Sequence, residues 1–592
     1  MNKARVLLKP SFFTTCLTRA ATLFSSVSQL RSFSRQMEVD PSNLERYCYD
    51  PVLRWDPQVE DYFTKAYGSD HFARISKALT RPSSYSCIRV NTVKTTTDSV
   101  IEKLTKILND SELVQSDGSS PISKCEIPGL DYVVFVNGSG PHRIEYGFSL
   151  DNPPKEVLVS RKCAEAVLRG AQVYVPGVLA CTAHVEKGDA VAVCVAMEQP
   201  GDEGDWSVNM TRGTTLQGLP TDPYYCERSG LYIGMGTTML SRAGMFRVPN
   251  GVAVDLSNRV FRLPSLHNVL EGEIFLQNLP SIVAAHALDP QKGERILDMC
   301  AAPGGKTTAI AILMKDEGEI VAADRSHNKV LDVQKLCAEM GLSCITTCKL
   351  DALKSVCLPN TLNDSTTLVN GDNCGSVTQL SSNEEAASDA SRIYEADKSC
   401  VENASTEEPN GGDNVSQADI RKNKRRMKNG RGRTQCQGGR VGKSQGFPPN
   451  SFDRVLLDAP CSALGLRPRL FAGLETVISL RNHGWYQRKM FDQAVQLVRV
   501  GGILVYSTCT INPSENEAVV RYALDKYKFL SLAPQHPRIG GPGLIGGCEF
   551  PDGYIEEWLK PGEEEMVQKF DPSSELDTIG FFIAKFSVGS KD

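Results

Sequence analysis

The sequence predicts an α/β protein: a doubly wound, Rossmann-like sheet with a small inserted β-barrel and a disordered insert. From residue 294 onward, short apolar stretches alternate with amphipathic stretches of helical length, which is typical of a parallel sheet covered on both faces. Between residues 156 and 255 the apolar stretches are short and separated by Gly and Pro turns, as in small barrels. Residues 360–449 are polar and poor in apolar side chains.

The overall composition is that of a soluble globular protein with several domains. The chain has 592 residues, of which 41% are apolar and 23% charged, and its formal net charge is −5. No apolar run reaches the roughly 20 residues that span a bilayer, so we expect no contact with a membrane. The 19 cysteines show no recurring zinc-ligand spacing, so we expect reduced thiols in an intracellular protein and no structural metal. The oligomeric state is left open, with a monomer favoured.

The first 36 residues differ in composition from the rest of the chain. They are rich in Ser, Thr, Leu and basic residues and contain no Asp or Glu, as organelle transit peptides do. Met37 then offers a second start, at the head of a segment that runs to residue 155. We therefore expect a mitochondrial or plastid product from Met1 and a cytoplasmic product from Met37. The alternative is an extension with no sorting role.

The middle of the chain predicts a small domain over residues 156–255. Ahead of it, residues 45–105 are expected to form a helix followed by a strand over "SCIRVNT", as the N-terminal segment of the catalytic region. The small domain combines "EVLVS", a helix in "KCAEAVLRG", and strands in "AQVYVPGV", "DAVAVCVAM" and "LYIGMGTTMLSRAGMF". This order resembles a PUA domain, a compact RNA-binding barrel, and an unrelated structural barrel is the alternative.

Residues 265–590 predict the catalytic domain, with alternating strands and helices. The expected strands are 295–299, 319–324, 344–351, 452–460, 502–510 and 580–586. The expected helices are 305–315, 328–341, 485–501 and 515–527. In such folds, ligands bind beyond the carboxyl ends of the strands.

In the insert at residues 360–449, acidic and basic residues lie in different parts of the sequence. Its first part is acidic, whereas its end contains the basic run "RKNKRRMKNGRGR", which predicts disorder. The basic run is suited to RNA phosphates or to a nuclear address. Pairing with its own acidic half is an equally good explanation.

The stretch "DMCAAPGGKTT" looks like a nucleotide-phosphate loop but departs from that motif. The first glycine of G-x-x-x-x-G-K-[ST] is replaced by Cys300, and Pro303 removes a backbone donor. Asp324 follows Lys306 by 18 residues at a strand end, where an acid binds ribose hydroxyls. Asp351 ends the next strand, where it can contact an adenine amino group; a helix cap is its ordinary alternative.

Two further loops, "DAPCS" and "STCT", each end a sheet strand with a cysteine. Cys461 and Cys509 should therefore face the same edge of the sheet as the glycine loop. Most other cysteines are expected to be small buried apolar residues.

The three motifs "DMCAAPGGKT", "DAPCS" and "YSTCT" together resemble the RNA cytosine-5 methyltransferases of the NSUN or Fmu/RsmB type. The resemblance covers residues 265–590 outside the insert, plus the segment around "CIRVNT", and implies a class I fold that uses S-adenosylmethionine (SAM). With a PUA-like domain, the chain is most similar to the sixth NSUN member, which methylates tRNA near its CCA end. The long insert after "KLDA" departs from the family pattern, which leaves the local geometry there open.

The resemblance implies a role for each site residue. Cytosine C5 becomes nucleophilic only after a thiolate adds to C6, and the family pattern gives this attack to Cys509. It gives Asp458 a hydrogen bond to N3, Cys461 the release of the product, and Lys306 a place facing the cofactor and the base. The residues implied to hold SAM are Cys300, Ala301, Ala302, Pro303, Gly304, Gly305, Lys306, Asp324, Asp351 and Asp458.

Other functions remain open on the sequence alone. The same chemistry on rRNA or mRNA is the nearest alternative, because motifs do not identify the RNA. A catalytically silent RNA-binding protein is the alternative from another class, although Asp458, Cys461 and Cys509 are all present. A DNA cytosine methyltransferase places its nucleophile in the "PC" loop, so the second cysteine in "STCT" favours RNA.

Overall fold

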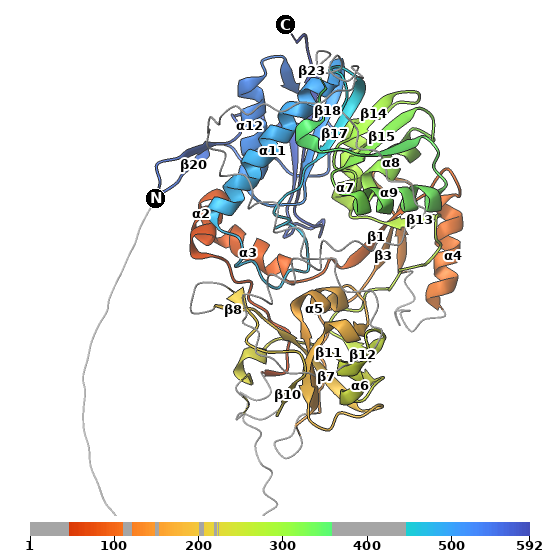
Figure 1. The fold of residues 1–592 in the computed structure, drawn as a ribbon, viewed down its shortest axis with the longest axis vertical. Helices are drawn as coiled ribbons and strands as arrows, with labels where there is room; N and C mark the ends of the chain where they lie inside the picture. Colours follow the sequence, from red (N-terminus) through yellow and green to blue (C-terminus); the bar gives the residue numbers. More distant parts are fainter. Residues whose placement is uncertain are drawn as a thin grey trace, which may run out of the picture.

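The structure is a computed structural model (Figure 1), and it describes residues 46–109, 121–147, 153–200, 206–217, 222, 224–357 and 446–591. The predicted transit segment, residues 1–36, and residues 360–445 of the predicted insert lie outside the described residues. No helix among the described residues is long and apolar enough to cross a membrane.

The catalytic domain is built on an eight-stranded sheet in which five neighbouring strands run parallel. In spatial order these are β16 (Ile345–Lys349), β15 (Glu319–Asp324), β14 (Arg295–Asp298), β17 (Phe452–Asp458) and β18 (Val498–Thr508). The order reverses beside β14, which is the first of them in the sequence. Ligands of doubly wound sheets bind at such a reversal.

One edge of the sheet departs from the predicted parallel arrangement. There, β23 (Phe581–Val588) runs antiparallel to β18 and pairs with β19 (Leu530–Leu532) and β22 (Val567–Phe570), both also antiparallel. Only ten residues connect β22 to β23, which suits an antiparallel pair and is shorter than a parallel crossover requires.

Helices cover both faces of this sheet (Figure 1). On one face, α7 (Leu279–Leu288) and α8 (Gly305–Leu313) pack on Ile296, Ile320 and Leu456. On the other, α11 (Val477–Leu497) and α12 (Glu517–Lys526) pack on Leu297, Val321 and Val455. Successive strand residues thus alternate between the two cores, as the pleat requires. Helix α9 (His327–Met340) lies between β15 and β16 in the sequence.

Two boundaries of the catalytic domain differ from the prediction. Helix α11 starts at Val477 rather than residue 485, because Thr476 and Ser479 form a capping box ahead of the apolar pattern. The insert is predicted to extend to residue 449, but Phe447 forms a bridge with Val356 and contacts the Phe452 ring. Residues 446–449 therefore belong to the folded domain.

The small domain contains a seven-stranded sheet in the order β10-β6-β4-β7-β11-β12-β5. The strands are β4 (Lys155–Ser160), β5 (Val173–Tyr174), β6 (Val178–Thr182), β7 (Ala190–Ala196), β10 (Thr214–Leu216), β11 (Tyr232–Thr238) and β12 (Val252–Arg259), with helices α5 (Arg161–Leu168) and α6 (Arg242–Arg247). Two expected strands are broken. A 3-10 turn containing Pro176 splits "AQVYVPGV", and Ser241 caps α6 within the stretch 231–246.

The small domain is inserted into another sheet. β1 (Tyr85–Val90), β2 (Ile122–Lys124), β3 (Val133–Asn137) and β13 (Ile274–Leu276) form an antiparallel sheet in the order β13-β1-β3-β2, next to α4 (Thr97–Asn109). The small domain lies between β3 and β13 in the sequence. Ahead of this sheet, α2 (Pro57–Tyr67) and α3 (Ser69–Leu79) pack on the catalytic domain near β20 (Gly547–Glu549) and β21 (Ile555–Glu557).

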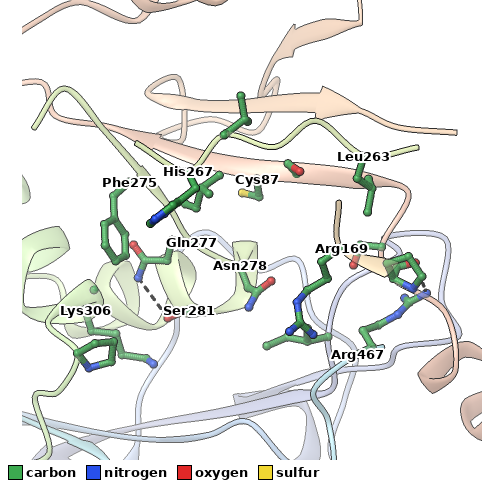
Figure 2. Close-up of a pocket in the computed structure, with 18 of the residues that line it drawn as sticks. Cys87, Arg169, Leu263, His267, Phe275, Gln277, Asn278, Ser281, Lys306 and Arg467 are labelled. Carbon is green, nitrogen blue, oxygen red and sulfur yellow. Dashed lines mark hydrogen bonds between the residues drawn. The ribbon is translucent and has the colours of Figure 1, made fainter. Parts of the chain in front are cut away.

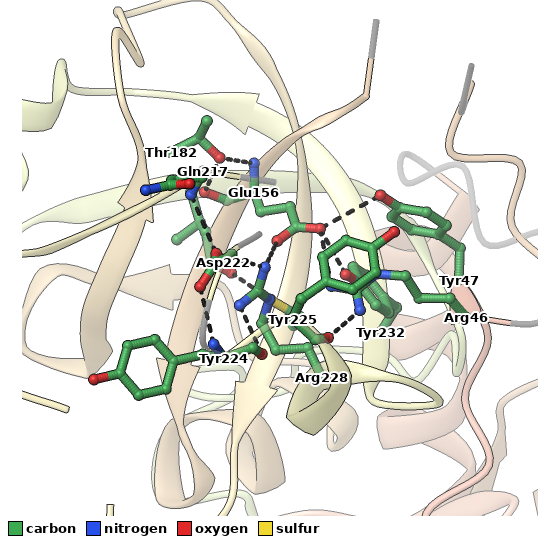
Figure 3. A network of polar contacts seen from close by, with 12 residues as sticks. Arg46, Tyr47, Glu156, Thr182, Gln217, Asp222, Tyr224, Tyr225, Arg228 and Tyr232 are labelled. Carbon is green, nitrogen blue, oxygen red and sulfur yellow. Dashed lines mark hydrogen bonds and ion pairs between the residues drawn. The ribbon is translucent and has the colours of Figure 1, made fainter. Parts of the chain in front are cut away.

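The start of the described chain is anchored in the small domain through a buried polar network (Figure 3). Arg46 lies over the Tyr225 ring, 3.5 Å from its centroid, and 3.6 Å from the Glu156 carboxylate. Glu156 also pairs with Arg228 at 2.8 Å and accepts a hydrogen bond from Tyr232 at 2.6 Å. Residues near position 46 thus join the small domain's core, and the chain then leaves to build α2 on the catalytic domain.

Candidate active site

The glycine loop lies between β14 and α8, at the reversal of the strand order. Gly304 has a φ of 107°, and a Cβ atom there would lie 3.1 Å from Leu336. The Ala301 amide donates to the Ala323 carbonyl at 2.9 Å, which rests the loop on the end of β15. A side chain at position 304 would therefore be strained and crowded, and residues 300–303, 305 and 306 of the loop line a cavity.

The two predicted cofactor acids sit at the ends of neighbouring strands. Asp324 ends β15 and accepts from the Ser326 amide at 3.0 Å. Asp351 follows β16 and accepts from the Leu353 amide at 3.1 Å, so it does cap a short helix. This arrangement of acids around a glycine loop fits the ribose and base of SAM. Burial raises the pKa of the Cys300 thiol well above its ordinary value, so this cysteine is neutral.

Lys306 and Asp458 form an ion pair across the site. The lysine Nζ lies 2.7 Å from one Asp458 oxygen, and the Ser507 hydroxyl donates to the other at 2.7 Å. Asp458 and Ser507 are register partners at the carboxyl ends of β17 and β18. The sequence did not single out Ser507, although it directly precedes "TCT".

The sequence also did not single out Asp298, an acid that is buried. It ends β14 and accepts a hydrogen bond from the Thr307 hydroxyl at 2.7 Å. Burial raises its pKa to about 7, and the nearby Asp458 acts in the same direction. Its position as the first residue of "DMCAAPGGK" was the available signal.

The two predicted cysteines meet. The Sγ atoms of Cys461 and Cys509 lie 3.4 Å apart, although 48 residues separate them in sequence. Cys461 is buried and Cys509 is partly exposed. The contact with Cys509, together with burial, raises the pKa of Cys461 well above its ordinary value. The pair can supply one reactive sulfur and one sulfur that holds a proton.

A cavity of about 580 Å³ lies in front of Lys306 and Asp458. Its walls come from three parts of the chain: the catalytic loops, the sheet of β1 and β13, and α5 with the residues after it. Figure 2 shows Lys306 on one side of this cavity and Arg169 of the small domain on the other, with Asn278 between them. The lining includes Asp298 and residues 300–303 but neither Cys461 nor Cys509. Residues of both domains therefore line the cavity.

Comparison with known proteins agrees with this geometry. The model of the 16S rRNA methyltransferase RsmB/F family matches residues 285–365 and 413–587, and the PUA domain model matches residues 155–200. The rRNA (cytosine-C(5))-methyltransferase NOP2C of Arabidopsis thaliana is 87% identical over 100% of both chains. The tRNA (cytosine(72)-C(5))-methyltransferase NSUN6 of Homo sapiens is 30% identical over 90% of this chain and 98% of its own.

A solved structure has the same overall fold as this chain. The crystal structure of NSun6 from Pyrococcus horikoshii with SFG, a SAM analogue, superposes with a TM-score of 0.59 at 25% identity. The match covers 91% of this chain and 99% of that one.

The sheet, its glycine loop and the paired cysteines define a class I SAM-dependent methyltransferase with a PUA domain. The chain belongs to the RNA cytosine-C5 methyltransferase family, as the sequence predicted. It is therefore an enzyme that methylates cytosine in RNA, and the alternative of a silent RNA-binding protein falls away.

Proposed function

We propose that the RNA substrate is tRNA and that the target cytosine lies near the CCA-bearing acceptor end. The observation that carries this proposal is the extent of the similarity. Relatives named for cytosine 72 of tRNA align with about 90% of this chain, the PUA region included. Those named for 26S and 28S rRNA align with only 53% and 54% of it.

Ribosomal RNA is the second candidate, and one observation favours it. The Arabidopsis thaliana relative, 87% identical to this chain, is named as an rRNA methyltransferase. In either RNA a stacked target cytosine must leave its stack to reach the active site. A stem next to a free tRNA end opens more easily than an internal rRNA stem, and the free end can also contact the small domain beside the cavity.

The experiment is methyl transfer from labelled SAM to tRNA transcripts with and without the 3′ CCA, and to an rRNA fragment, using residues 37–592. We expect 5-methylcytosine in tRNA that depends on CCA. Label in rRNA alone would replace the first candidate with the second. Methylation of tRNA that does not depend on CCA would support tRNA as the substrate but contradict a target near the acceptor end.

We propose that Cys509 is the nucleophile and that Cys461 releases the product. The Cys509 thiolate adds to C6 as N3 gains a proton, which leaves an enamine with a nucleophilic C5. SAM, when bound, supplies the methyl group. C5 then gives its proton to Cys461, and the Cys509–C6 bond breaks to restore the ring double bond. Because the pKa of Cys461 is raised, its thiol must first lose its own proton to water, and the resulting thiolate is then a strong base for the proton on C5.

The proton for N3 comes from the Lys306–Asp458 pair. N3 of cytosine only accepts hydrogen bonds, so an ionised Asp458 cannot donate to it. Lys306 lies 2.7 Å from Asp458, so the pair together holds a proton beside the cavity. Release of the product returns the N3 proton to the pair.

The residues proposed to hold SAM are those around the glycine loop. Asp324 and Asp351 bind the ribose and the adenine, and residues 300–306 close over the methionine end. Each acid accepts one hydrogen bond from a nearby backbone amide. Neither acid forms an ion pair with another described residue, so a ligand would not have to break one in order to bind.

Two variants test the roles of the cysteines. We expect Cys509→Ala to abolish methyl transfer and to leave SAM affinity nearly unchanged, and we expect Cys461→Ala to accumulate a denaturant-resistant adduct with RNA. Full activity of Cys509→Ala would remove the nucleophile assignment. Absence of the adduct in Cys461→Ala would remove the release role.

We also propose that the start site decides the location, with Met1 giving an organellar product and Met37 a cytoplasmic one. The support is the acid-free, basic composition of residues 1–36. Fluorescent fusions of the two products in plant cells test this, and identical distributions would contradict it.

A further inference from the structure

Glu515 is a buried acid that the proposed reaction does not use. It ends the short helix Pro513–Glu515, six residues after Cys509, and its exposed fraction is 0%. Burying a carboxylate is costly unless donors surround it. Four hydrogen-bond donors surround the Glu515 carboxylate, and they come from residues in or next to the loops that contain Cys461 and Cys509.

One carboxylate oxygen of Glu515 accepts from the Ser462 hydroxyl at 2.5 Å and from the Asn512 amide at 2.9 Å. The other accepts from the Ser462 backbone amide at 3.0 Å and from Gln487 at 2.8 Å. Ser462 directly follows Cys461, so Glu515 holds the backbone of the "DAPCS" loop from two directions.

The same network reaches both sides of each cysteine. Gln487 also donates to the Pro460 carbonyl at 2.9 Å, just ahead of Cys461. The Ser462 and Thr510 hydroxyls lie 2.8 Å apart and link the residues that follow the two cysteines. Tyr506, on the strand that leads to Cys509, donates to the Glu515 carbonyl at 2.6 Å.

We propose that Glu515 is a positioning residue: it ties the loop of Cys461 to the loop of Cys509 and so sets the 3.4 Å separation of the two sulfurs. It touches neither sulfur in any hydrogen bond between described residues. For catalysis, this inference rests on the proposed roles of the two cysteines.

The carboxylate also sets the charge around the thiols. Burial raises the pKa of Glu515, and its negative charge in turn raises the pKa of Cys461. Among the described residues, the other titratable or charged groups that face this network are Cys509, Tyr506 on β18, His483 and Arg488 on α11, Asp458 at the end of β17, and Arg469, which faces Cys509. Removing the charge should therefore make Cys461 reactive at lower pH, an effect that a purely structural residue would not produce.

The test compares Glu515→Gln and Glu515→Ala with Glu517→Gln in the full chain. Glu517 is equally buried but binds Lys569 and the Leu544 amide, away from the cysteine loops. The first measurement is alkylation of Cys461 and Cys509 by iodoacetamide against pH, read by mass spectrometry without RNA. We expect the Cys461 profile to move to lower pH in Glu515→Gln and to stay in place in Glu517→Gln.

The second measurement is single-turnover methyl transfer to tRNA. We expect Glu515→Ala to lose on the order of 10- to 100-fold in rate with a nearly unchanged SAM affinity, and Glu515→Gln to recover part of the loss. If Glu515→Ala does not fold, Glu515→Gln, with almost the same volume, carries the comparison. A wild-type rate and a wild-type alkylation profile in Glu515→Gln would overturn the proposal.

The two measurements separate this inference from the proposed function. Thiol alkylation needs no RNA, so it reads the cysteine loops even if tRNA proves to be the wrong substrate. If the alkylation profile of Cys461 shifts in Glu515→Gln but wild type does not methylate tRNA, the positioning role of Glu515 stands and tRNA is rejected as the substrate. An equal shift in Glu517→Gln would reject the positioning role.

Discussion

Glu156 in the small domain and Glu515 in the catalytic domain are both fully buried, but their surroundings differ. Glu156 lies between two arginines, Arg46 and Arg228, so opposite charges compensate it. Glu515 is held mainly by neutral hydroxyl and amide donors. The ionic network anchors a distant piece of chain to a domain, whereas the neutral network sets the geometry of two loops. The ionic network around Glu156 should therefore matter most for stability, and the neutral network around Glu515 for catalysis.

The largest effect is expected from breaking the ionic network. Glu156→Ala leaves Arg46 buried without a counter-charge and Arg228 paired only with Asp222, which costs about 3–5 kcal/mol of unfolding free energy. Urea unfolding of wild type and variant measures the difference. Glu186→Ala, at an exposed position of the same domain, is the control and should change stability by less than about 0.5 kcal/mol.

The next effect concerns a buried acid, Asp298, which has no arginine among its partners in the described part of the chain. Asp298 has a folded-state pKa of about 7 against an ordinary 3.8, so the folded state holds its proton over a wider pH range. Stability from this group is therefore present below pH 4 and is lost as pH rises to about 7, by up to about 4 kcal/mol. Unfolding of wild type and Asp298→Asn across this range should diverge. Parallel pH curves would contradict the raised pKa.

The smallest effect is expected from removing one arginine rather than the shared acid. Arg46→Met keeps Glu156 paired with Arg228 and bonded to Tyr232, and loses the contact with the Tyr225 ring. We expect a cost of about 1–2 kcal/mol, typical of a desolvated cation over an aromatic ring. Urea unfolding measures it beside Glu156→Ala. A cost as large as that of Glu156→Ala would show that Arg46, not Arg228, is the main partner of the acid.

Much of the fold could be read from the sequence because its signals are local. The parallel strands and the helices between them follow from apolar stretches of the right length, and the glycine loop from residues 300–306. The antiparallel edge could not be read this way, since β19 and β22 are short and pair only with β23. Strand direction depends on the path of the chain, which periodicity does not encode.

The site residues also divide into those that the sequence predicts and those that it does not. Lys306, Asp458, Cys461 and Cys509 stand in recognisable motifs, and the fold brings the acid to the lysine and the two sulfurs together. Glu515 was not singled out because its importance comes from Ser462 and Gln487, which lie 53 and 28 residues before it. A residue defined by distant partners leaves no pattern in its own neighbourhood.

The insertion of the small domain between β3 and β13, together with the anchoring of Arg46, has a geometric consequence. The domain is fastened to the rest of the molecule by three separate passages of chain, before α2, after β3 and before β13 (Figure 1). Three connections restrict rotation of a domain more than a single linker does. Arg169 of the small domain should therefore keep its place in the wall of the cavity, opposite Lys306.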